Sequence, residues 1–93
     1  GRYNEAVMAL TQAVRRNSVN PLYFYGLGVS YCNLNNYNLG IANLKKSIEL
    51  NPSTPDFHKT IAECYLKAGK EQEYDEHMRI ANMTTLGSTY ELI

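Results

Sequence analysis

Residues 35–52 read NNYNLGIANLKKSIELNP, and this stretch decides the fold. The segment GRYNEAVMALTQAV, at residues 1–14, has the same order of aromatic, small and apolar residues thirty-four positions earlier. Further matches occur at the same offset: Tyr3 with Tyr37, Leu10 with Leu44 and Met78, Pro21 with Pro55, and Tyr31 with Tyr65. Self-similarity at a fixed period of this size is typical of proteins that stack one small unit several times. The sequence therefore predicts a repeat architecture.

Each repeat contains signals for two helices joined by a short turn. Asn20-Pro21 and Thr54-Pro55 place a capping side chain before a proline at the first helical position, where the missing N–H costs nothing. The apolar residues after each proline recur at helical spacing, and Asn or Gly then follows, which can adopt the left-handed conformation that ends a helix. We therefore expect five helices, over residues 4–17, 21–35, 38–50, 55–69 and 71–83.

Small residues indicate how these helices meet. Gly28 in one predicted helix and Gly40 in the next lack side chains, so the two backbones can approach closely. One such pair of helices cannot bury its apolar face alone, and each pair is therefore stable only when it stacks on the next. We predict an all-α stack of antiparallel helix pairs, with a half repeat at 1–20, a repeat at 21–54, a divergent terminal repeat at 55–83 and a C-terminal tail at 84–93. The tail fits no helix well and is expected to fray or to lie as a strand.

The charge balance limits the kinds of partner. Nine basic and nine acidic residues give a formal charge of zero, which argues against nucleic acid or an anionic membrane as the main partner. No apolar run approaches the roughly 18 residues that span a bilayer. Cys32 and Cys64 form no CxxC motif and no disulfide framework is expected, so the cysteines favour a reduced, cytoplasmic protein. The chain opens at Gly1 inside a repeat and is expected to be a fragment of a larger protein.

No group of residues predicts catalysis. His58 and Cys64 are six residues apart on one predicted helix, so they point to different sides and cannot form a nucleophile–base pair. His77 follows Glu73 at the spacing of a surface pair on a helix, and no HxxxH or Cys/His cluster suggests a metal site. There is also no glycine-rich phosphate loop. We expect no enzyme activity, no cofactor and no metal.

The best-matched repeat has a specific motif of aromatic, leucine, glycine and small residues across its two helices. Its members are Phe24, Leu27, Gly28, Tyr31, Gly40, Leu44, Ser47 and Pro52. This pattern resembles the tetratricopeptide repeat, and the resemblance covers roughly residues 1–83. It implies a right-handed superhelical stack of helix pairs, an α-solenoid. Two positions depart from the family pattern, because His58 stands where an aromatic is usual and Tyr74 where a small residue packs.

The resemblance also implies a function. In this family the first helix of each unit lines a concave groove that holds an extended peptide or a partner helix. The chain would then be a scaffold or adaptor that binds a protein or peptide partner. The candidate groove residues are Leu22, Tyr25, Val29, Cys32, Asn33, Lys59, Glu63 and Lys67. Some members clamp the acidic C-terminal tails of chaperones with Lys and Asn on these helices. Asp56 and Glu63 occupy two corresponding places here, so no such binding is expected.

Two other hypotheses remain open. The predicted N-terminal helix has no pairing helix, so Val7, Leu10 and Val14 would present an apolar stripe that a second copy could cover in a homodimer. Alternatively, the chain could be the non-catalytic part of an enzyme whose active domain lies outside these residues.

Overall fold

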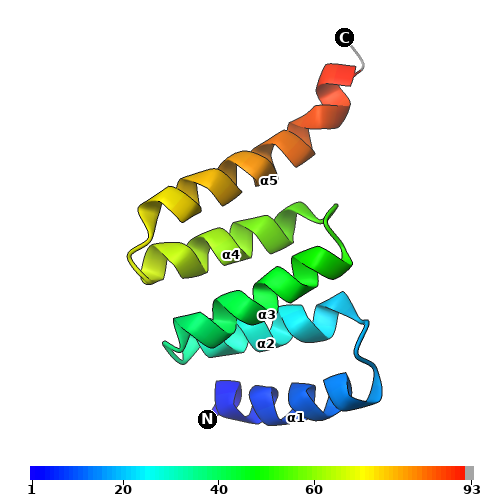
Figure 1. Cartoon of the computed structure of the whole chain (residues 1–93), viewed down its shortest axis with the longest axis vertical. Helices are drawn as coiled ribbons and strands as arrows, with labels where there is room; N and C mark the ends of the chain where they lie inside the picture. The colour runs from blue at the N-terminus through cyan, green and yellow to red at the C-terminus, as the bar shows by residue number, and fades with distance from the viewer. Residues whose placement is uncertain (92–93) are drawn as a thin grey trace.

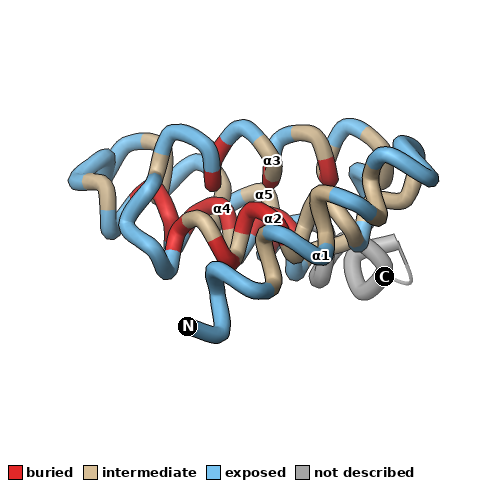
Figure 2. The backbone as a smooth tube through the Cα atoms, turned by 90° about the horizontal axis from the view of Figure 1, so that it is seen from below, coloured by how far each residue is buried: buried red, intermediate tan, exposed pale blue. Residues whose placement is uncertain are grey.

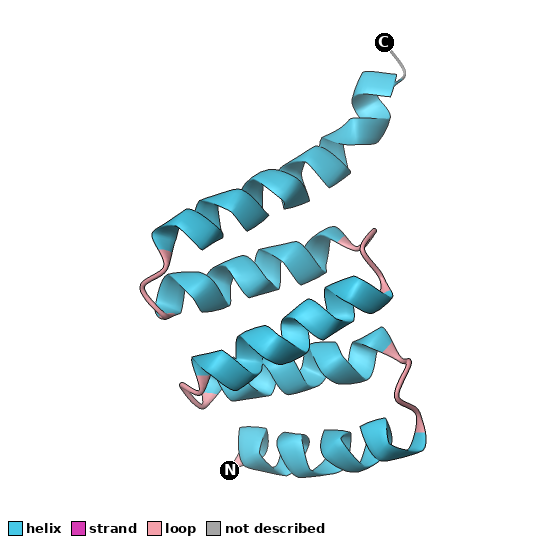
Figure 3. Ribbon diagram, in the orientation of Figure 1, coloured by secondary structure: helices cyan, strands magenta, loops and turns pink. Residues whose placement is uncertain are grey.

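The computed structural model describes the backbone of residues 1–91 and the side chains of residues 1–83. Within these residues the chain forms five helices and no strand. They are α1 (Arg2–Arg16), α2 (Pro21–Asn33), α3 (Tyr37–Leu50), α4 (Pro55–Lys67) and α5 (Glu71–Glu91). Successive helices run antiparallel and are joined by short loops; the stack rises from α1 to α5, with α2 lying behind α3 in this view (Figures 1 and 3). The predicted stack of helix pairs is confirmed.

The helix ends follow the capping signals of the sequence. The Asn20 side chain accepts a hydrogen bond from the Leu22 backbone N–H at 2.9 Å, directly before the proline that opens α2. At the other end, Asn35 has a φ of 64°, and the Asn36 N–H donates to the Tyr31 carbonyl at 2.8 Å. A left-handed residue followed by this bond is the usual way to satisfy the last carbonyls of a helix. Gly69, with a φ of 80°, closes α4 in the same way.

Glycine allows α2 and α3 to touch through their backbones. A methyl group added at Gly28 would lie 3.0 Å from the Gly40 carbonyl oxygen, and one added at Gly40 would lie 3.1 Å from the Gly28 carbonyl oxygen. Leu44 covers this contact and is completely buried. The predicted close approach of Gly28 and Gly40 is therefore confirmed.

The core lies between α2, α3 and α4. Ile41 and Leu44 of α3 pack there against Ile61 and Tyr65 of α4. Figure 2 shows the buried positions along these middle helices, whereas α1 has no buried residue. This distribution follows from the stacked design, because an inner unit has a neighbour on both sides and an outer unit on one.

A disulfide joins Cys32 of α2 to Cys64 of α4, with their Cα atoms 5.9 Å apart. The expectation that these cysteines are reduced is wrong. They are separated by 32 residues, close to one repeat, so the stacking of α4 on α2 brings them together. The cytoplasmic location stays a prediction, and the cysteines no longer favour it, since disulfides are rare in reducing compartments.

The last helix is longer than the sequence indicates. We expected it to end near Met83 and the following residues to fray or form a strand. Instead α5 continues to Glu91, so that expectation is wrong for residues 84–91. Once a helix has formed, each added residue gains one backbone hydrogen bond without a new nucleus, so extension of an existing helix is favourable. Residues 92–93 lie outside the described part of the chain.

Candidate protein-binding site

The residues predicted to line the groove come from α2 and α4, the first helices of two successive repeats. Five of them are exposed, and Leu22 keeps 63% of its surface accessible. The exposed members are Leu22, Asn33, Lys59, Glu63 and Lys67. Tyr25 and Val29 are half-buried. The structure therefore places most of the predicted set at the surface.

Tyr25 links the two helices and does not stand free. Its ring centroid lies 5.0 Å from that of Phe57, and its hydroxyl oxygen lies 3.0 Å from the Thr60 hydroxyl oxygen. Aromatic pairs at this separation attract each other beyond the area that they bury. These contacts with α4 fix the orientation of the Tyr25 side chain, part of which remains exposed at the surface.

Cys32 does not belong to the exposed set. Only 5% of its surface is accessible, and its sulfur is bonded to Cys64. The prediction that Cys32 lines an open groove is wrong, because the residue faces α4 and not the solvent. The apolar or aromatic members of the predicted set that reach the surface are therefore Leu22 and the half-buried Tyr25 and Val29.

A hollow of about 370 Å³ opens between the first turns of α2 and α4 and the loop before α4. Its lining residues are Asn20, Pro21, Leu22, Tyr25, Asn51, Thr54, Asp56 and Phe57. Apolar and aromatic side chains provide most of its lining, together with amide and hydroxyl groups. The helical spacing of the sequence indicates that Leu22 and Tyr25 belong to the binding surface. It misses Asn51 and Thr54, because they lie in a loop to which helical spacing does not apply.

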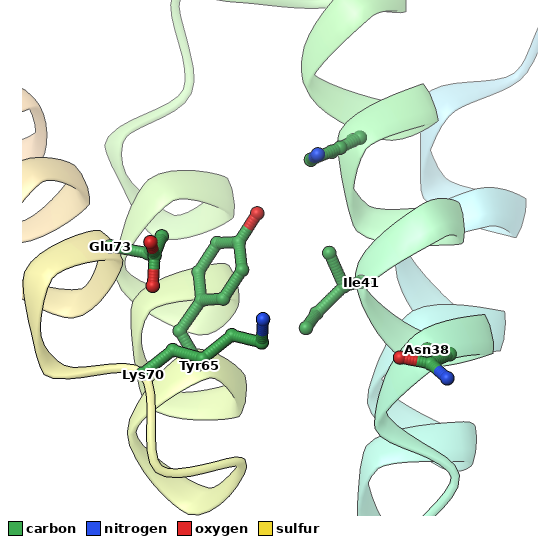
Figure 4. Close-up of a pocket in the computed structure, with 6 residues that line it drawn as sticks. Asn38, Ile41, Tyr65, Lys70 and Glu73 are labelled. Atoms are coloured by element: carbon green, nitrogen blue, oxygen red, sulfur yellow. The ribbon is translucent and has the colours of Figure 1, made fainter.

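A second hollow, of about 310 Å³, lies between α3 and α5. Figure 4 shows the Tyr65 ring standing between Glu73 and Ile41, with Lys70 at its edge. Charged and polar groups provide most of its lining, which also includes Asn38 and Lys45. Tyr65 of α4 also lines it, and it shares no lining residue with the hollow between α2 and α4.

A family model described as tetratricopeptide repeat matches residues 22–54. The chain carries the tetratricopeptide-repeat fold. The matched segment covers α2, α3 and the loop after α3, which is the repeat that contains the contact between Gly28 and Gly40.

Solved structures agree with this tetratricopeptide-repeat assignment. MamA MSR-1 has 30% sequence identity and a TM-score of 0.88, over 94% of this chain and 50% of that one. MamA AMB-1 has 29% identity and a TM-score of 0.88, over 92% of this chain and 51% of that one. The Yersinia enterocolitica type III secretion translocator chaperone SycD shares the fold, with 23% identity and a TM-score of 0.85 over 90% of this chain and 64% of that one. The chain spans about half the length of the MamA chains. No curated protein sequence matches it.

No helix among the described residues of this tetratricopeptide-repeat chain is long and apolar enough to cross a membrane. The same residues contain no group of three or more His, Cys, Asp or Glu side chains that could hold a metal ion.

Two histidines lie at the packed surface between α4 and α5. The Nδ1 atoms of His58 and His77 are 3.2 Å apart, and the two rings are stacked with centroids 5.4 Å apart. The ring of Tyr65 also stacks on the ring of His77, with centroids 5.5 Å apart. His77 was expected to pair with Glu73 on the surface, and that expectation is wrong: its ring is half-buried against α4. His58 replaces the aromatic residue usual in the family and still takes part in a ring stack.

Both imidazoles are held neutral by their surroundings. Burial lowers the pKa of His58 below its ordinary value, and a hydrogen bond to the Pro52 backbone offsets part of that effect. Burial also lowers the pKa of His77, helped by repulsion from His58 and Lys45 and opposed by Glu76. One ring can then donate its Nδ1–H to the unprotonated Nδ1 of the other, whereas two imidazolium ions would repel each other.

We expect acid to destabilise this part of the stack. Histidine in an unfolded chain has a pKa of about 6.5, and both folded values are lower, so the unfolded state binds more protons as the pH falls through this range. The free energy of unfolding should be constant above about pH 7.5 and fall as the pH drops below about 6.5, by at most about 1.4 kcal/mol per pH unit for each histidine. Urea unfolding followed by circular dichroism measures this slope.

The variant His58→Phe is the control, because phenylalanine keeps a stacked ring and cannot bind a proton. It removes one titrating group and relieves the repulsion on His77, so its stability should depend less on pH over the same range. A slope equal to that of the unmodified chain would contradict the assignment to the histidine pair.

Proposed function

We propose that this chain is a protein-interaction module that binds a peptide segment of a partner across the exposed face of α2 and α4. The observation that carries the proposal is the position of Leu22 at the hollow of about 370 Å³. This side chain is 63% exposed and stands beside Tyr25 and Phe57. An exposed leucine by itself is common, but one that adjoins two aromatic residues at an open apolar hollow forms contiguous apolar surface, which is typical of a contact site.

The size and walls of the hollow support a peptide as the ligand. Ligand sites are concave, mostly apolar and edged by a few polar groups, and they begin at about 300 Å³. One large side chain of a partner could fill the space between Leu22 and Phe57. The remaining candidates along α4, Lys59, Glu63 and Lys67, are exposed on the same helix and extend the surface away from the hollow.

Self-association through α1 has weaker support. Val7, Leu10 and Val14 are half-buried, and Leu10 lies against Gly26 of α2, so the expected apolar stripe is partly covered within the chain. Met8 stays 69% exposed, but no hollow adjoins it among those described. The proposed role in protein interaction is also compatible with the third hypothesis, in which the chain is the non-catalytic part of a larger enzyme.

A library of random peptides displayed on phage tests the proposal directly. We expect the intact chain to enrich peptides that bind it. The substitution Leu22→Lys should weaken the affinity for these peptides by roughly 10-fold to 100-fold, since burying one leucine contributes about 1.5–3 kcal/mol. The matched control is Leu66→Lys. Leu66 is an exposed leucine of α4, 46% accessible, that does not line the hollow.

The two variants should keep the circular dichroism spectrum of the unmodified chain, because neither leucine is buried. Equal binding by Leu22→Lys and Leu66→Lys, or no enriched peptide at all, would refute the proposed site.

A further inference from the structure

The hollow between α2 and α4 has an unusual distribution of charge. Of the residues that line it, Asp56 alone carries a charge. The whole of α2, PLYFYGLGVSYCN, contains no charged side chain, so nothing on that helix offsets the carboxylate. The charge at the opening of the hollow is therefore set by one acidic group on an apolar background.

The Asp56 carboxylate is exposed and has no ionic partner within the described residues. Their one ion pair joins Lys46 to Glu49 on α3, at 3.8 Å. Asp56 belongs to the first turn of α4, where the positive end of the helix dipole favours an acidic side chain. Within the described residues no hydrogen bond or ion pair uses the Asp56 carboxylate oxygens, so they can accept hydrogen bonds from a ligand cation.

The amide groups at the rim complement an extended backbone. The Oδ1 atom of Asn20 already accepts from the Leu22 N–H at 2.9 Å, and Oδ1 of Asn51 accepts from the Ser53 N–H at 3.3 Å. With both oxygens used inside the protein, each side chain retains its NH₂ group as a donor. The natural acceptors for such donors are the backbone carbonyls of a peptide.

We infer that the partner segment carries a large apolar side chain that fills this hollow and, within a few residues of it, a lysine or arginine that pairs with Asp56. This inference rests on the proposed function, and it specifies the chemistry of the partner. Acidic segments would place like charges together at the rim and are disfavoured. A lysine or arginine fits the site because it donates hydrogen bonds to a carboxylate and neutralises it.

The test compares peptides that the displayed library yields on the unmodified chain, on Asp56→Lys and on Glu5→Lys. Glu5 provides the matched control, since it is an exposed acidic residue in the first turn of another helix, α1, and does not line the hollow. We expect the unmodified chain to enrich Leu, Met or Phe next to Lys or Arg. Asp56→Lys should shift the enrichment toward Asp or Glu, and Glu5→Lys should leave it unchanged.

Measured affinities give a second readout that does not depend on charge reversal. For a synthetic peptide from the first selection, Asp56→Asn should weaken binding by about fivefold, the upper range for one exposed ion pair, with less effect at high salt. The same peptide with its basic residue replaced by alanine should bind the unmodified chain and Asp56→Asn equally.

The possible results distinguish the inference about the partner's basic residue from the proposed binding site. Two results would overturn the inference and leave the proposed function standing. One is the enrichment of apolar peptides that lack a basic residue, and the other is equal binding of the selected peptides by the unmodified chain and both Asp56 variants. Enrichment of acidic peptides on the unmodified chain would also overturn it. If Leu22→Lys and the unmodified chain yield the same peptides, the proposed site and the inference both fail.

Discussion

Replacing Cys32 and Cys64 together by alanine should lower the free energy of unfolding by about 3–4 kcal/mol. The cross-link closes a loop whose ends are 32 residues apart, and a loop of that size restricts the unfolded chain by about this amount in the chain-entropy description. Domains of this size are stable by only about 5–15 kcal/mol in total, so the loss is a large fraction. Chemical unfolding of the oxidised chain and of the double variant measures the difference.

A reducing agent provides the control for this prediction. Addition of a dithiol should destabilise the unmodified chain by a similar amount and should not affect the double variant, which has no disulfide to lose. Thiol labelling of the unfolded chain, without reductant, should find no free cysteine. An unmodified chain that is equally stable with and without reductant would contradict the stabilising role of the cross-link between α2 and α4.

The second large effect concerns Gly28, where alanine should destabilise the fold by about 1–3 kcal/mol, the usual cost of overpacking a core. Within an exposed helix, replacement of glycine by alanine stabilises by about 1 kcal/mol, so the expected sign is reversed here. The added methyl group would meet the Leu44 side chain and would lie 3.0 Å from the Gly40 carbonyl oxygen. Backbone cannot move aside as a side chain can, and α2 and α3 would have to separate.

Gly26→Ala is the matched control, since Gly26 lies two residues earlier in the same helix. Its added methyl group would meet the end of the Leu10 side chain at 2.8 Å, and that flexible group can shift. Thermal unfolding should therefore show Gly26→Ala close to the unmodified chain and Gly28→Ala well below it. If Gly28→Ala is as stable as Gly26→Ala, the backbone contact between α2 and α3 does not limit the packing.

The candidate site was only partly predictable from the sequence. Helical spacing places Leu22 and Lys59 on exposed faces, as the structure has them. Spacing along one helix does not reveal which residue of the neighbouring helix covers a side chain. For this reason the spacing could not show that Cys32 is buried against α4 while Val29 is half-exposed. It also did not indicate that the Tyr25 ring packs against Phe57.

The sequence by itself determined the repeat, the helices that compose it, most of the helix ends and the contact of Gly28 with Gly40. These features depend on local signals, namely caps, prolines, left-handed turns and apolar spacing, which act within one unit of the stack. Tertiary structure alone decided three others: the disulfide between α2 and α4, the stacked pair His58 and His77, and the hollow at Asp56. Each is formed by residues from different helices. The disulfide and the hollow depend on how one unit stacks on the next, and the histidine pair depends on how α4 packs against α5 within the last unit.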